Sequence, residues 1–257
     1  MIQTPDVYLC EVTQSRELSG TVFSLTVMCP EIAGTARAGQ FVMVKCGAER
    51  VLRRPLSICR VRGETFELVF ERKGAGTRWL SECARGQTLD VMGPLGNGFE
   101  LPAGRIIVVG GGIGSPPMLF AAETAGGGAD CVLGFRGSEN IILTEDFAKV
   151  CGKVILTTDD GSRGVHGTVA APLEELLKEG GYAAVAACGP RPMLSAVAAL
   201  SGRYDVKCFV SLEERMGCGT GACVVCVCET RSAGGETSMS RVCRDGPVFN
   251  ARDVAWE

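Results

Sequence analysis

The hydrophobic pattern of this 257-residue chain changes twice, and each change limits what the next segment can fold into. Up to about residue 100, short runs such as TVFSLTVM and ETFELVF alternate apolar and polar residues. A period of two is typical of strands with one buried face. Because Gly-containing turns separate the runs, residues 1–100 are predicted to form an antiparallel β-barrel. The segment GTRWLSECA is predicted to be a short helix with Thr77 as its N-cap.

Between residues 101 and 210, continuous apolar runs replace this alternation. RIIVVGG, ADCVLGF, KVILTT and YAAVAACG are typical of buried strands, and SPPMLFAAETA and TVAAPLEELLKEG are helix candidates between them. Strands that alternate with helices favour a doubly wound parallel sheet. The segment 97–105 is the expected junction between the barrel and this α/β domain.

Residues 211–257 follow neither pattern and are predicted to form a third, small domain. Roughly 45 residues are too few for a good core of their own. A segment of this kind usually needs a metal or a neighbouring domain to order it.

Composition excludes several classes of function. The net charge is −3 and no basic run is present, so nucleic acid is not an expected partner. No apolar stretch reaches the roughly 20 residues of a membrane span, and the N-terminus does not read as a secretory signal. We therefore expect a cytoplasmic protein whose 14 cysteines are reduced thiols or metal ligands. Ten of them stand singly among apolar neighbours, as small buried hydrophobes do.

The remaining four cysteines have a specific spacing. Cys218, Cys223, Cys226 and Cys243 read C-x4-C-x2-C-x16-C, which is the spacing of a plant-type [2Fe-2S] cluster. Glycines at 217, 219 and 221 let the loop curl closely around such a cluster. A structural zinc site is less well matched, because paired C-x2-C units are absent. A disulfide framework conflicts with the expected compartment. Cys228 is set aside as a spare thiol.

Two further pairs of segments have the composition of nucleotide sites. RRPLSI offers a guanidinium and a hydroxyl, and FERKGAGT follows with glycines at a helix start, where free amides suit a pyrophosphate. VVGGGIGSPPM and ACGPRPM each follow a predicted strand and precede a predicted helix. In a parallel sheet such strand ends lie along one edge, where ligands bind. Each segment alone is a weak signal, and their order and spacing together are stronger.

On these residues the chain resembles the flavodoxin/ferredoxin reductase superfamily. The resemblance implies that Arg54, Pro55, Leu56 and Ser57 form the FAD-binding Arg-x-x-Ser motif and that Gly74, Gly76 and Thr77 receive the pyrophosphate. Val69, Phe70 and Glu71 lie on the strand where that superfamily packs the cofactor. A nicotinamide nucleotide is implied for the remaining set, which is Gly110, Gly111, Gly112, Gly114, Cys188, Gly189 and Pro190. NAD rather than NADP rests on resemblance only, since Arg136 could attract a 2'-phosphate.

Within the superfamily, RRPLSI, PLGNGF, GGGIGSPPM, GFRG, TDDGS and VCRDGPVF resemble the electron-transfer subunits of dihydroorotate dehydrogenase B. This implies an oxidoreductase subunit of pyrimidine biosynthesis that carries FAD and a [2Fe-2S] cluster, uses NAD, and partners an FMN-containing catalytic subunit in a heterotetramer of two of each. Dihydroorotate oxidation would occur on the partner, and no acid–base residue is expected in this chain.

Two alternatives remain open at this point. One is the small subunit of a sulfide dehydrogenase or of an NADH-dependent ferredoxin:NADP oxidoreductase, which has the same three-part plan with a different partner. The other is a zinc-binding regulatory module that has kept a reductase scaffold without its flavin.

Overall fold

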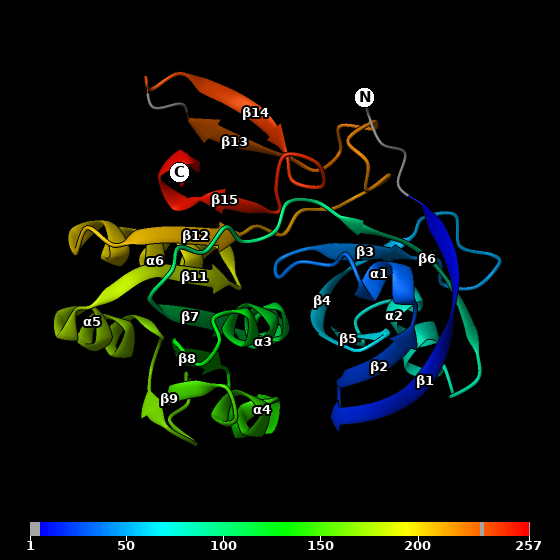
Figure 1. Cartoon of the computed structure of the whole chain (residues 1–257), viewed down its shortest axis with the longest axis horizontal. Helices are drawn as coiled ribbons and strands as arrows, with labels where there is room; N and C mark the ends of the chain where they lie inside the picture. Colours follow the sequence, from blue (N-terminus) through cyan, green and yellow to red (C-terminus); the bar gives the residue numbers. More distant parts are fainter. Residues whose placement is uncertain (1–5, 232–233, 257) are drawn as a thin grey trace.

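A closed barrel of six antiparallel strands forms the N-terminal part of the computed structural model, which describes residues 6–231 and 234–256 (Figure 1). The strands are β1 (Val7–Ser19), β2 (Val22–Met28), β3 (Phe41–Val44), β4 (Arg54–Arg62), β5 (Thr65–Glu71) and β6 (Thr88–Leu95). They close in the order β1-β2-β5-β4-β3-β6. Two short helices, α1 (Pro30–Ala33) and α2 (Ala75–Ser81), connect them. The predicted barrel is confirmed.

The period-two pattern correctly identifies the barrel core, with Phe23, Leu25 and Val27 all buried. It also predicts that Ser24 and Glu67 point away from the core, yet both are buried as well. They lie on a part of the barrel wall that faces the second domain, and the Ser24 hydroxyl donates a hydrogen bond to the Glu67 carboxylate. Packing between domains therefore buries polar residues that a single-strand pattern assigns to solvent.

A parallel sheet with helices on both faces follows the barrel, as predicted. Its strands are β7 (Arg105–Gly111), β8 (Ala129–Phe135), β9 (Cys151–Thr158), β10 (Val165–His166), β11 (Tyr182–Cys188) and β12 (Lys207–Ser211). The order β10-β9-β8-β7-β11-β12 runs outward from β7 in both directions, which is a doubly wound arrangement. Helices α3 (Ser115–Thr124) and α4 (Thr144–Ala148) lie on the face toward the barrel, and α5 (Ala170–Glu179) and α6 (Arg191–Arg203) on the other (Figure 1).

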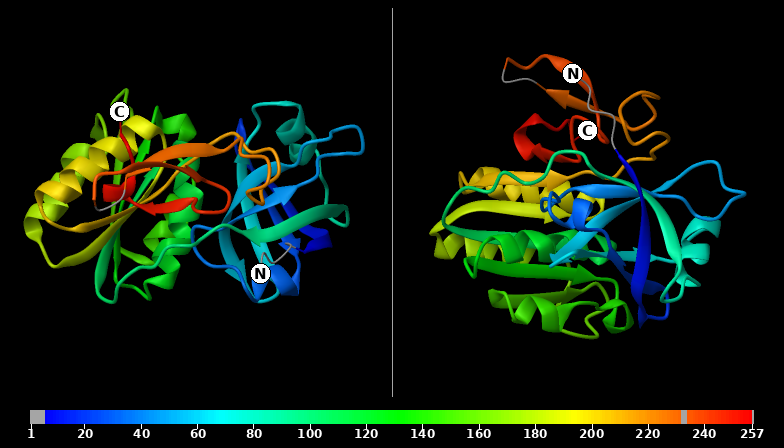
Figure 2. Two further views of the ribbon diagram at one scale, coloured as in Figure 1. Left: turned by 90° about the horizontal axis from the view of Figure 1, so that it is seen from above. Right: turned by 45° about the vertical axis from the view of Figure 1, so that its right-hand side comes forward.

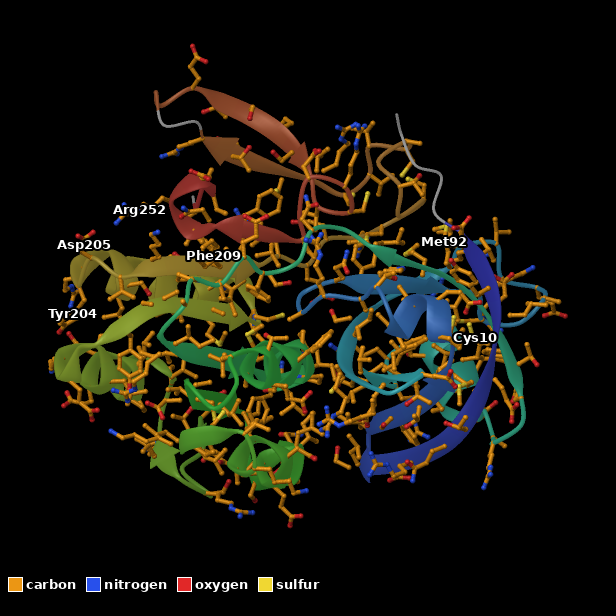
Figure 3. The ribbon with its side chains drawn as sticks, in the orientation of Figure 1. Cys10, Met92, Tyr204, Asp205, Phe209 and Arg252 are labelled. Atoms are coloured by element: carbon orange, nitrogen blue, oxygen red, sulfur yellow. The ribbon has the colours of Figure 1, made fainter. Side chains whose placement is uncertain are left out.

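The C-terminal segment lies across the end of both domains (Figure 2). It contains a hairpin of β13 (Val227–Arg231) and β14 (Thr237–Arg241), and β15 (Val248–Asn250), which extends the α/β sheet by pairing antiparallel with β12. These strands were not predicted, because β14 is exposed and polar and β15 has only three residues. Arg252 and Asp205, which follows the end of α6, lie side by side on the surface, 2.9 Å apart (Figure 3).

The predicted N-cap of α2 is wrong. Gly74 occupies the N-cap position, and Thr77 lies inside the first turn. The Thr77 hydroxyl instead accepts hydrogen bonds from the backbone amides of Lys73 at 2.9 Å and Gly74 at 3.1 Å. The N-cap therefore lies three residues earlier than expected, and Thr77 fixes the glycine loop that precedes it.

The domain ranges 1–100, 101–210 and 211–257 stay predictions. The barrel strands fall inside the first range and the parallel strands inside the second, except that β12 ends one residue beyond it, at Ser211. Of the ten single cysteines, eight are buried, while Cys151 and Cys188 are partly exposed. No helix in the described part of the chain has both the length and the apolar character that a bilayer crossing demands.

Candidate functional site

The two segments predicted to bind a flavin meet at Gly76. A Cβ atom on Gly76 would lie 2.5 Å from Nε of Arg54 and 3.0 Å from its Cγ, closer than non-bonded atoms approach. Glycine at this position therefore lets the Arg54 side chain lie directly against the first turn of α2. The structure brings the arginine at the start of β4 together with a helix start whose first amides lack intrahelical partners.

Arg54 keeps part of its donor capacity free. Its Nη1 donates to the carbonyl of Leu52 at 2.6 Å and more weakly to that of Arg53 at 3.4 Å. Among the described residues, no carboxylate forms an ion pair with Arg54, whereas neighbouring Arg53 is paired with Asp90 at 2.7 Å. A guanidinium held by carbonyls and not neutralised by a carboxylate is suited to a phosphate.

The other predicted flavin residues fall into two groups. Ser57 is partly exposed on β4, opposite Phe41, while Leu56 is buried and Pro55 partly exposed. On β5, Phe70 is in the barrel core, where its ring lies 6.4 Å from that of Phe23. Since side chains alternate along a strand, Val69 and Glu71 point to the opposite face from Phe70. That assigns Phe70 to barrel packing and leaves Val69 and Glu71 as the candidates on β5.

The two predicted nucleotide loops also meet through glycines. A Cβ on Gly114 would lie 2.4 Å from the carbonyl oxygen of Cys188 and 2.7 Å from the amide nitrogen of Gly189. A Cβ on Gly111 would lie 2.9 Å from Pro190. Hence the loop after β7, which includes the 3₁₀ turn η1 (Gly112–Gly114), packs directly on the loop after β11 at the carboxyl edge of the sheet.

The start of α3 supplies fewer amide donors than expected for a phosphate site. Pro116 and Pro117 occupy its first turn and carry no N–H group, and the Ser115 amide is already bonded to the Gly112 carbonyl. The Ser115 side chain is fully buried, and its hydroxyl has no hydrogen-bond partner within the described residues. This hydroxyl lies beside Gly110 and is enclosed by protein atoms, so it is an unsatisfied polar group of the domain interior and not a ligand contact.

Cys188 lies where the two nucleotide loops touch. Burial raises the pKa of its thiol to about 12, although a hydrogen bond with Ser211 partly opposes the shift. The thiol is therefore protonated at neutral pH, which suits a packing or hydrogen-bonding role better than a nucleophilic one.

The cluster cysteines accept hydrogen bonds from backbone amides of their own loop. The Cys218 sulfur accepts from the amides of Thr220 at 3.3 Å and Cys223 at 3.4 Å, and the Cys243 sulfur from Gly221 at 3.1 Å. Gly219 and Gly221 have φ values of 76° and 84°, as the predicted curl requires. Val224 also has a positive φ, 59°, which a β-branched residue rarely adopts.

Thiol–thiol hydrogen bonds link Cys218 with Cys223 and Cys226 with Cys243, and Cys243 also interacts electrostatically with Cys218. In the described part of the chain, no three His, Cys, Asp or Glu side chains converge closely enough to share one metal ion. A [2Fe-2S] cluster takes two thiols for each of its two irons, and four thiols in two hydrogen-bonded pairs match that donor set. The arrangement fits a binuclear cluster.

The pairs differ in exposure and in acidity. Cys226 and Cys243 are buried, while Cys218 is partly exposed and Cys223 exposed. Burial alone raises the pKa of Cys218, but the Thr220 hydroxyl and the amides of Cys223 and Thr220 outweigh it and lower that pKa to about 6. Burial raises the pKa of Cys243 to about 12. Cys218 is thus available as a thiolate at neutral pH, the form that binds metals.

Neighbouring segments hold the cluster loop in place. The sequence did not predict that they contact it. A Cβ on Gly219 would lie 2.7 Å from Cγ of Met43 and 3.3 Å from Leu95, so the loop rests on β3 and β6 of the barrel. Asn97 donates its side-chain amide to the carbonyls of Arg244 at 3.2 Å and Asp245 at 3.0 Å. Asn97 lies in the motif PLGNGF, and Arg244 and Asp245 lie in VCRDGPVF, but nothing in the spacing of the two motifs predicts that they touch.

Substitution of Gly76 tests the flavin assignment. We expect Gly76→Ala to displace the Arg54 guanidinium and to weaken FAD retention roughly 10- to 100-fold, because a charged hydrogen bond contributes about 1.5–3 kcal/mol. The measurement is the FAD dissociation constant by fluorescence. Gly20→Ala is the matched control, since Gly20 lies in the turn between β1 and β2, outside both flavin segments, and no atom lies within 4 Å of its Cβ. Equal retention by both variants would remove Arg54 from the site.

Two serine substitutions test the ligand set. Cys223→Ser is expected to lose the cluster, and Cys228→Ser to keep about two irons per chain, because Cys228 lies on β13 opposite Ser240 and belongs to neither thiol pair. Iron analysis and visible absorbance after anaerobic purification measure the outcome. Cys228→Ser should lower the free energy of unfolding by about 1–3 kcal/mol, through burial of a hydroxyl. Iron loss in Cys228→Ser with retention in Cys223→Ser would reverse the assignment.

Comparison with known proteins agrees with this geometry. Residues 213–255 match the model of the iron-sulfur cluster binding domain of dihydroorotate dehydrogenase B. Among solved structures, that of an NADH-dependent reduced ferredoxin-NADP oxidoreductase is 29% identical, with a TM-score of 0.86 over 97% of this chain and 90% of that one. The ferredoxin reductase of carbazole 1,9a-dioxygenase, 21% identical with a TM-score of 0.67 over 78% of this chain and 66% of that one, shares the fold.

Curated relatives are similar over almost their whole length. The dihydroorotate dehydrogenase B (NAD(+)) electron transfer subunit of Bacillus caldolyticus is 41% identical over 254 residues, covering 95% of this chain and 96% of the relative. That of Caldanaerobacter subterraneus is 39% identical over 248 residues, covering 95% and 97%. The chain therefore belongs to the family of electron transfer subunits of dihydroorotate dehydrogenase B.

Proposed function

We propose that this chain carries electrons from a partner dihydroorotate dehydrogenase subunit to NAD+, through a [2Fe-2S] cluster and FAD. The observation that carries the proposal is the order of the three candidate sites in space. The nucleotide loop η1 contacts β5, and α3, which begins at that loop, packs against β4. The flavin motif lies on β4, so the nucleotide and flavin sites are direct neighbours.

The cluster loop adjoins the same strands from the other side. Met43 on β3 lies opposite Pro55 of the flavin motif, and the cluster loop rests on Met43 at Gly219. One strand therefore separates the flavin motif from the cluster loop, and neighbouring strands lie only about 4.8 Å apart. When bound, FAD supplies the ability to exchange electrons in pairs with a nicotinamide and singly with an iron-sulfur cluster.

The chain's own residues perform binding and positioning in this scheme. Arg54 and the start of α2 would hold the FAD phosphates, Gly114 and Cys188 would shape the nucleotide loop, and the four cysteines would hold the irons. The amides that donate to Cys218 and Cys243 stabilise negative charge on the thiolates, which favours electron acceptance by the cluster.

The partner is proposed to be an FMN-containing catalytic subunit, with two of each subunit in the complex. The exposed edge of the cluster loop supports the placement of this partner against that loop. Cys223 is exposed, and the adjacent Val224 and Val225 each keep 56% of their surface accessible. Two apolar side chains exposed beside a redox centre are suited to burial against another protein.

The competing assignment is a subunit of a ferredoxin–NADP oxidoreductase. Of the two solved structures compared, the one of that type has the higher TM-score, 0.86 against 0.67. The relatives named as dihydroorotate dehydrogenase subunits are more similar in sequence, at 39% and 41% against 29%. That difference favours the dihydroorotate assignment.

Reconstitution tests the proposal. Mixed with an FMN-containing catalytic subunit of dihydroorotate dehydrogenase B, the chain should support dihydroorotate-dependent reduction of NAD+, measured by the absorbance of NADH, and neither subunit should do so alone. The control replaces NAD+ with NADP+. A reconstituted complex that reduces NADP+ with ferredoxin but not NAD+ with dihydroorotate would favour the competing assignment.

The interface prediction uses Val225. We expect Val225→Asp to weaken assembly about tenfold or more, because a charge would be buried against the partner, while iron and FAD contents stay unchanged. Val165→Asp is the matched control, since Val165 is 45% exposed on β10, at the opposite edge of the α/β sheet from β15. Titration with labelled partner measures both. Unchanged affinity for Val225→Asp would move the interface elsewhere.

A further inference from the structure

We propose that an interdomain ion network, centred on Arg60, sets the position of the nucleotide-binding domain relative to the flavin, and so controls the rate of hydride transfer between them. This inference rests on the proposed function. The network joins barrel residues to two helices of the α/β domain, and its members are Arg16, Arg60, Arg62, Glu67, Glu123 and Asp146.

Arg60 makes contacts in both domains. Within the barrel, its Nε lies 3.1 Å from Glu67 on β5. Across the domain boundary, its Nη1 lies 3.0 Å from Asp146 on α4 and 3.9 Å from Glu123 on α3. Arg60 is thus a single side chain that ties the barrel wall to both helices on the facing side of the sheet.

The remaining members close the network. Arg62 donates a bond of 3.0 Å to Glu123, again across the boundary. Arg16 pairs with Glu67 at 3.0 Å, and the Ser24 hydroxyl also donates to Glu67. The network therefore holds three arginines and three carboxylates, and the exposed Lys149, 3.7 Å from Asp146, adds a fourth cation at its edge.

Burial makes these pairs more than surface contacts. The side chains of Arg60, Glu67 and Glu123 keep only 13%, 7% and 11% of their surface exposed. Solvent and salt screen such charges far less than exposed ones, so the pairs hold a defined geometry. Removing one partner leaves another charge buried without its counterion, which favours separation of the domains.

The network lies on the same two elements that carry the reacting sites. Strand β4 contains the flavin motif at Arg54–Ser57 and, three residues after Ser57, Arg60. Helix α3 begins directly after the nucleotide loop Gly112–Gly114 and has Glu123 in its last turn. Each element thus carries a site residue at one end and a network residue at or toward the other.

This placement lets a shift at the network move the nucleotide loop. A helix of ten residues is about 15 Å long, and it moves as a rigid body. If the Glu123 end of α3 shifts away from β4, the nucleotide loop at the other end shifts with it. Misplacement of reacting groups by about 1 Å can cost roughly 100-fold in rate. The network therefore acts through position and touches neither cofactor.

Four variants of the complete complex test the inference. Arg60→Gln removes the centre of the network, Arg60→Lys keeps its charge, and Asp146→Asn removes one cross-domain contact without altering the barrel. Arg105→Gln is the matched control, because Arg105 pairs at 2.7 Å with the buried Asp130 inside the α/β domain alone. Anaerobic stopped-flow reduction by NADH separates the limiting rate constant from the NADH dissociation constant.

We expect Arg60→Gln and Asp146→Asn to lower the limiting rate constant about 10- to 100-fold, with the dissociation constant changed less than threefold. Arg60→Lys should restore part of the rate, and Arg105→Gln should match the unmodified complex. As a readout independent of turnover, hydrogen exchange of segment 115–124 should accelerate in the first two variants only. FAD and iron contents should be unchanged.

Several outcomes would overturn the inference. These are an unchanged limiting rate constant in Asp146→Asn, an equal loss in Arg105→Gln, or a loss confined to the NADH dissociation constant. Arg60→Gln could lose FAD through damage to the barrel, in which case Asp146→Asn decides. If the unmodified complex is not reduced by NADH at all, the proposed function fails, independently of the network.

Discussion

Three close backbone approaches organise this molecule, and each depends on a glycine. At Gly76 the start of α2 meets Arg54, at Gly114 the loop after β7 meets Cys188, and at Gly219 the cluster loop meets Met43. In each case a Cβ atom would lie within 2.7 Å of its neighbour, so no other residue fits without rearrangement. These contacts build a flavin motif on the barrel, a nucleotide loop at the carboxyl edge of the parallel sheet and a cluster loop seated on β3. The assignment of function depends on how near these three lie to one another.

Much of the architecture follows from sequence pattern. Period-two alternation in the runs that form β2 and β5 predicted a barrel, and the continuous apolar runs of β7, β8, β9 and β11 predicted a parallel sheet, since both patterns reflect which faces are buried. The spacing of Cys218, Cys223, Cys226 and Cys243 predicts the cluster ligands, because a tight loop and one returning segment would supply them. The site residues themselves remain predictions, supported by the contacts at Gly76 and Gly114.

The misses have physical reasons. Thr77 has the preferences of an N-cap, but Gly74 takes that position and the Thr77 hydroxyl bonds to the amides before it. Glu67 was assigned to solvent by alternation, and its burial depends on arginines that are distant in sequence. Strand β15 is too short to show a period, and it forms because the edge of β12 accepts it. Each miss involves a partner that a local pattern does not contain.

The central claim is that one chain joins a nicotinamide site to an iron-sulfur cluster through a flavin. The most direct measurement adds NADH anaerobically to the isolated chain, loaded with FAD and iron, and follows the flavin and cluster absorbance bands in a stopped-flow instrument. The account predicts that both bands bleach, the flavin first and the cluster after it, without any partner present. Bleaching of the flavin while the cluster stays oxidised would contradict it.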